Sequence, residues 1–188
     1  MSGPETASTG AGPVARFITV SLARELGILL ALSVLFPFMV HILPVPDDAQ
    51  LGPRLLPIFY APLLATLWGR LETAAAVALL APVGNWALTG HPAGGGIVIM
   101  TVQLVAFVAA LRGLLASAGA HCLLAVPAYV AGLAASTLLA ALAPGLIGGQ
   151  PALAWAVHSA VIGLPGIAIL ILIGWLALRH YPPGAAAA

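Results

Sequence analysis

Long runs of apolar residues, separated by short segments rich in Gly and Pro, make up most of the chain. Because a hydrocarbon core about 30 Å thick requires roughly 20 apolar residues per helix, such runs predict transmembrane helices. The separating segments carry the usual signals of turns and loops. We expect about six helices, of which the second is shorter than a full span, at residues 21–43, 55–68, 72–89, 97–115, 121–142 and 152–178.

Charged residues are too scarce for a soluble fold. They form 6% of the 188 residues, against 62% hydrophobic residues, whereas a soluble domain carries about 25% charged residues. The fold class expected is therefore an all-α integral membrane protein, a bundle whose solvent is the lipid bilayer. Residues 21–180 would form the transmembrane domain, between disordered tails at 1–20 and 181–188. The chain has no basic patch, so nucleic acid is not expected as a partner.

The arginine residues predict the orientation of the bundle. Cytoplasmic loops of membrane proteins carry an excess of Lys and Arg. If both termini are cytoplasmic, only Arg54 lies outside, and the others lie inside: Arg16, Arg24, Arg70, Arg112 and Arg179. We therefore expect a multi-pass protein of the cell's inner (cytoplasmic) membrane with both termini inside. The longer connections at 44–54, 90–96 and 143–151 would then face outward.

Several predicted helices contain an internal proline, namely Pro37, Pro62, Pro82, Pro127 and Pro165. Each proline removes one backbone hydrogen bond and bends its helix. Membrane helices tolerate this loss where neighbouring groups satisfy the carbonyl that is left free. Bent helices can widen one end of a bundle into a cavity, but proline is also common in membrane helices without such a role.

Polar and aromatic residues at helix depth are the candidates for a ligand site, because polar groups are costly in a bilayer. A cavity with aromatic rings and a few polar groups is typical of sites for small organic molecules. An interfacial aromatic belt is the alternative for the Trp residues, and a bond to a neighbouring helix is the alternative for Gln103 and His158. The candidates on the outer side are His41, Arg54, Tyr60, Asn85, Trp86, His91, Gln103, Trp155 and His158.

No motif in the sequence indicates catalysis. Gly-x-Ser-x-Gly and His-Glu-x-x-His elements are absent, as are paired acidic residues within the predicted helices. The histidines are not spaced as metal ligands, and no Walker motif is present. We therefore expect neither an enzyme nor a bound cofactor or metal, and any energy from ATP would have to come from a partner.

Short motifs follow one another in order along the first half of the chain: Arg24-Glu25, Pro37 with His41, Leu56-Pro57 with Pro62, Gly69-Arg70, Ala81-Pro82, and Leu88-Thr89-Gly90 with Pro92. In order and spacing they resemble the substrate-binding S component of energy-coupling factor (ECF) transporters. Many members carry a His-x-Pro element in the second helix, where this chain has Phe59, Tyr60, Ala61 and Pro62. This departure leaves the subgroup and the ligand open.

The resemblance implies a subunit for vitamin or cofactor uptake. It would bind a small, partly aromatic nutrient in an outward-facing cavity made by the third to sixth helices and capped by the connections after the first and third. Its partners would be a membrane-embedded coupling subunit and a pair of ATPases.

A small-residue face on the first helix docks on the coupling subunit in the resembled family. Ala23, Gly27 and Ala31 recur here at every fourth residue, which creates a surface that another helix can approach closely. Ordinary packing within the chain is the alternative for this face. The alternative function is a non-transporting membrane scaffold or assembly protein, whose polar residues only hold its helices together.

Overall fold

The computed structural model describes residues 13–42, 51–68 and 70–180, and this part of the chain contains helices and connections but no strand. Short 3₁₀ helices precede or connect some of the α-helices; they are η2 (Pro57–Phe59), η3 (Cys122–Leu124) and η4 (Pro144–Ile147). The all-helical fold class is confirmed. The α-helices are α1 (Pro13–His41), α2 (Leu51–Leu55), α3 (Tyr60–Trp68), α4 (Leu71–Thr89), α5 (Gly95–Ala118), α6 (Ala125–Leu142), α7 (Ala152–Ile162) and α8 (Leu164–His180).

Several of these helices are long and apolar enough to cross a membrane, as expected of a multi-pass membrane protein. Four pass by length and composition, namely residues 22–40 of α1, then α4, α5, and η3 with α6. A fifth span is reached if η4 and α7 are taken together with α8. The predicted second helix corresponds to η2 and α3, which form an apolar helix shorter than a full span, as expected.

The last predicted helix is broken into α7 and α8, which meet at Gly163 with a bend of 55°. Pro165 explains the break, because it has no N–H to donate to the carbonyl of Val161, and it is tolerated in the first turn of α8. Another boundary also differs from the prediction. Helix α1 begins at Pro13, so residues 13–20, expected in the tail, belong to the helix.

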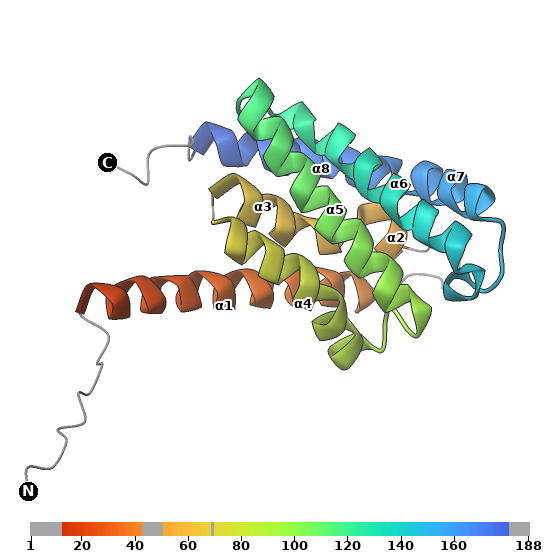
Figure 1. Cartoon of the computed structure of the whole chain (residues 1–188), viewed down its shortest axis with the longest axis horizontal. Coiled ribbons are helices and arrows are strands. Elements are labelled where there is room, and N and C mark those ends of the chain that lie inside the picture. The colour runs from red at the N-terminus through yellow and green to blue at the C-terminus, as the bar shows by residue number, and fades with distance from the viewer. Residues whose placement is uncertain (1–12, 43–50, 69, 181–188) are drawn as a thin grey trace, which may run out of the picture.

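The short helix α3 occupies the centre of the bundle. It contacts α1, α4, α5 and α8, and Figure 1 shows it enclosed between these longer helices. Ala61, Leu63 and Ala65 are completely or almost completely buried. Just before α3, the Phe59 ring packs edge-on against Phe107 of α5 and Tyr129 of α6, with ring centroids 5.2 and 5.5 Å apart. The short helix is therefore a core element rather than a span.

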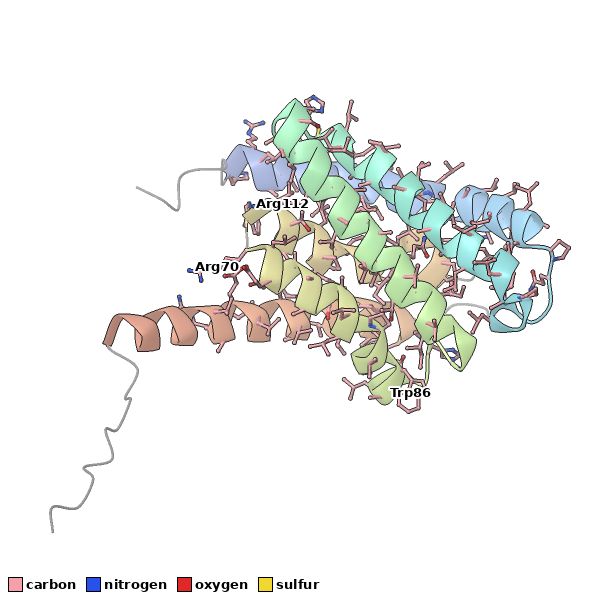
Figure 2. The ribbon with its side chains drawn as sticks, viewed as in Figure 1. Arg70, Trp86 and Arg112 are labelled. Carbon is pink, nitrogen blue, oxygen red and sulfur yellow. The ribbon has the colours of Figure 1, made fainter. Side chains whose placement is uncertain are left out.

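Three arginine residues lie at one end of the bundle. Arg70 at the start of α4 and Arg112 near the end of α5 lie at the same end (Figure 2). The first turns of α1 and the last turn of α8, which carries Arg179, are at this end as well (Figure 1). The opposite end carries α2, α7 and the connections from α4 to α5 and from α6 to α7.

Candidate ligand cavity

A cavity of about 480 Å³ lies at the end of the bundle away from Arg70 and Arg112. Residues of α1, α2, η2, α4, α5, α6, η4 and α7 line it, together with the connection between α4 and α5. Its volume falls within the range of sites for small organic ligands, about 300–1,000 Å³. The same end carries the connection from α4 to α5 and η4, which belong to the segments 90–96 and 143–151.

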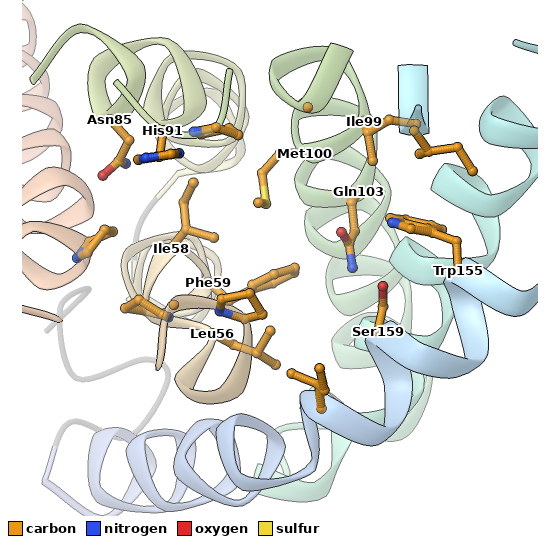
Figure 3. A pocket seen from close by; sticks show the side chains of 18 of the residues that line it. Leu56, Ile58, Phe59, Asn85, His91, Ile99, Met100, Gln103, Trp155 and Ser159 are labelled. Carbon is orange, nitrogen blue, oxygen red and sulfur yellow. The ribbon is translucent and has the colours of Figure 1, made fainter. Parts of the chain in front are cut away.

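Most of the cavity wall is apolar. Figure 3 shows Ile58, Met100 and Ile99 around the space, with Phe59 and Leu56 at one side. Polar side chains gather in two places in this view. Asn85 and His91 lie together near α4, whereas Gln103 and Ser159 lie with Trp155 between α5 and α7.

Asn85 is held in one orientation by two backbone carbonyls. Its side chain is 2% exposed, and Nδ2 donates hydrogen bonds of 2.9 Å to the carbonyl oxygens of Ser33 and Ala81. Only the NH₂ group can donate to two acceptors, so the other amide atom must be the oxygen. That oxygen, Oδ1, is buried and has no hydrogen-bond partner.

Gln103 brings a second amide to the cavity. Its side chain is 7% exposed, and its amide makes no hydrogen bond to any other described residue. Helix α6 passes very close at this level, because a Cβ added at Gly132 would lie 2.6 Å from the Gln103 carbonyl oxygen and 3.4 Å from its Cγ. The glycine thus permits the close helix contact that positions Gln103.

Leu56 lines the cavity and has an unusual backbone conformation. It has φ 53° and ψ 40°, in the left-handed region, which costs a residue other than glycine about 1–2 kcal/mol. This turn separates α2 from η2 and buries the Leu56 side chain against α8. A Cβ added at Gly166 of α8 would lie 2.6 Å from the Leu56 Cγ. Packing of α8 therefore holds the strained residue in place.

Two connections cap the cavity together. His91, Pro92 and Gly96, between α4 and the first turn of α5, line it from one side, and Leu146 and Ile147 of η4 line it from another. A Cβ added at Gly95 would lie 2.6 Å from the backbone of Leu146. The first turn of α5 and η4 are therefore packed backbone to backbone, and only glycine fits between them.

The structure brings together many of the ligand-site candidates identified in the sequence. Of these, Asn85, His91, Gln103, Trp155 and His158 all line the cavity. Tyr60, by contrast, belongs to the core: its hydroxyl donates to the carbonyl oxygen of Leu55, and its ring packs edge-on against Phe36 at 5.5 Å. Arg54 is exposed on α2 and does not line the cavity. The side chain of His41 lies outside the described part of the chain.

Trp86 also lies away from the cavity. It is 48% exposed and points outward from α4 (Figure 2). Adjacent residues of a helix point in different directions, so Trp86 cannot share the surface that its neighbour Asn85 presents. This position is the one expected of an aromatic side chain in a membrane interface.

Several lining residues were not identified from the sequence. Leu56, Ile58, Phe59 and Met100 are apolar residues in an apolar chain, so no local signal separates them from core residues. Ser159 carried a weak signal, since it is a hydroxyl residue within a predicted apolar helix. Within the described residues, no group of three or more His, Cys, Asp or Glu side chains is arranged to hold a metal ion.

Compared with known proteins, the chain matches no protein-family model, no curated protein and no solved structure. Its function must therefore be inferred from its residues and their arrangement. The cavity and its polar side chains are the features that bear most directly on function.

Proposed function

We propose that this chain is the substrate-binding S component of an ECF-type uptake transporter and captures a small vitamin- or cofactor-like nutrient. The observation that carries the proposal is the cavity of about 480 Å³, into which separate helices bring Asn85, Gln103 and Trp155. Apolar walls with a few converging polar groups suit a small organic molecule. The ordered motifs from Arg24 to Pro92 support the same assignment.

The proposal includes an orientation with both termini in the cytoplasm. Arg70 and Arg112 gather at one end of the bundle (Figure 2), which supports a cytoplasmic position for that end. The cavity would then open toward the outside. Cys122 is the chain's one cysteine, so Ala93→Cys in a Cys122→Ser background offers a single thiol. A membrane-impermeant maleimide added to intact cells should label it, and labelling only after permeabilisation would contradict the orientation.

The partners in this proposal are a coupling membrane subunit and a pair of ATPases. Ala23, Gly27 and Ala31 are all exposed on α1, and a Cβ added at Gly27 would meet no atom within 4 Å. The described helices therefore leave this small-residue face uncovered, which supports its use for docking another helix.

Mass spectrometry of small molecules released from the gently purified, detergent-solubilised protein tests the proposal. We expect one organic compound at a stoichiometric ratio to the protein, and co-purification of an ATPase pair from the native membrane. An empty protein whose thermal stability does not respond to vitamins would contradict it. That result would favour a scaffold, a role consistent with the hydrogen bond from Asn85 to Ser33 that joins two helices.

A further inference from the structure

Building on the proposed function, we propose that the cavity selects an uncharged ligand that is polar at both ends. One end would donate an N–H or O–H group to Asn85 Oδ1. The other would carry an amide, lactam or similar donor–acceptor edge that pairs with the Gln103 amide. The segment between these ends would be apolar and would lie against Ile58, Phe59 and Met100 (Figure 3).

The first step concerns Asn85. Both hydrogen atoms of Nδ2 are directed to backbone carbonyls, so the amide cannot turn over without placing its oxygen against two other oxygens. The oxygen is therefore a fixed acceptor on a residue that lines the cavity, and this buried atom makes no hydrogen bond within the described chain. Buried polar atoms in folded proteins are nearly always hydrogen-bonded. A ligand group that donates a hydrogen bond supplies what this atom lacks.

The second step concerns Gln103 and its surroundings. Its amide offers two donors and one acceptor, none of which is bonded to another described residue. The hydroxyl of Ser159 likewise makes no such bond, and both side chains lie at the same side of the cavity in Figure 3. A planar group with a donor beside an acceptor pairs with an amide through two hydrogen bonds, as side-chain amides do with base edges. Trp155 beside Gln103 offers a flat surface for such a group.

The third step concerns charge. Among the described residues that line the cavity, none is Asp, Glu, Lys or Arg. An ion enters an apolar cavity at high cost unless an opposite charge meets it there. The described wall offers hydrogen-bonding groups but no carboxylate, ammonium or guanidinium group. The cavity therefore favours a neutral molecule over a carboxylate or phosphate of the same shape.

The test compares full-length Gln103→Leu with wild type, using the compound that the wild-type protein releases. Gln103 makes no hydrogen bond within the described chain, so its replacement by a residue of similar size should leave the melting temperature of the empty protein unchanged. We expect the dissociation constant to rise about tenfold. Asn85→Leu should weaken binding as well, and comparison with its melting temperature separates lost contact from lost folding.

Thr101→Val is the matched control. Thr101 lies on the same helix, donates to the Ile97 carbonyl at 2.8 Å and does not line the cavity, so ligand affinity should stay unchanged. A released ligand that is ionised at neutral pH, or unchanged affinity in Gln103→Leu, would overturn this inference and leave the proposed function standing. A wild-type protein that holds no ligand and binds no vitamin would overturn both.

Discussion

Asn85 on α4 completes the backbone hydrogen bonding of α1 at Ser33. The carbonyl oxygen of Ser33 would normally accept from the N–H four residues later, but that residue is Pro37, which has none. The Asn85 Nδ2 donates to this oxygen at 2.9 Å instead. A neighbouring helix thus satisfies the carbonyl that the proline leaves free, as expected for a proline inside a membrane helix.

This relationship predicts that Asn85 and Pro37 are energetically coupled. Asn85→Leu should lower the free energy of unfolding by about 1–3 kcal/mol, because it leaves a buried carbonyl without a partner. In a Pro37→Ala background the loss should be about 1 kcal/mol smaller, since the alanine N–H can bond Ser33 within the helix. Reversible denaturation in detergent, followed by circular dichroism, measures both. Equal losses in the two backgrounds would show that the proline has no part in the effect.

Replacing Trp155 should weaken ligand binding, whereas replacing Trp86 should not. Trp155 lines the cavity, whereas Trp86 is exposed outside it. Removing a large aromatic contact costs a ligand about 2 kcal/mol or more, so Trp155→Ala should weaken binding at least about thirtyfold. Trp86→Ala should leave affinity unchanged. Equilibrium binding of the released compound to each purified variant distinguishes them, and equal effects would place the ligand elsewhere.

Gly132 and Gly113 form a matched pair for the packing of α5. Gly132→Ala would bring a methyl group within 2.6 Å of the Gln103 carbonyl oxygen, and forced separation of the helices should cost about 1–3 kcal/mol. Ligand affinity should fall too, because Gln103 moves with α5. A Cβ added at Gly113 meets no atom within 4 Å, so Gly113→Ala should leave stability equal or slightly raised. A stable Gly132→Ala protein with normal affinity would show that this contact does not position Gln103.

The exposed face of α1 predicts a variant that folds but does not assemble. Gly27→Leu adds bulk where the described chain leaves open space, so the melting temperature and ligand binding should not change. Docking of a partner helix on the small-residue face should be lost. Ala168→Leu, on an exposed position of α8, is the control for added bulk. Co-purification with the coupling subunit and ATPases measures assembly, and normal recovery with Gly27→Leu would rule out this face.

Features that depend on a short stretch of residues were predictable. Helix α4 spans Leu71–Thr89 and was expected at 72–89, because apolar length and turn residues are local properties. The scarcity of charge indicated a membrane protein from composition alone. Pro165 likewise indicated a bend in the last helix, and the structure places the break beside it, at Gly163. By contrast, the separate α2 was not predicted, because residues 51–54 were expected in an outer connection; the left-handed turn at Leu56, packed against Gly166 of α8, separates it from η2.

The candidate site was also predictable from the sequence only in part. The sequence by itself determined which residues are polar or aromatic within an apolar chain, and therefore identified Asn85, Gln103 and Trp155 as candidates. Only the tertiary structure decided that Asn85 faces the cavity while Trp86 faces outward, and that Tyr60 belongs to the core. The physical reason is that hydropathy belongs to each residue, whereas a cavity is made by side chains from separate helices whose relative rotation depends on packing contacts far apart in the sequence.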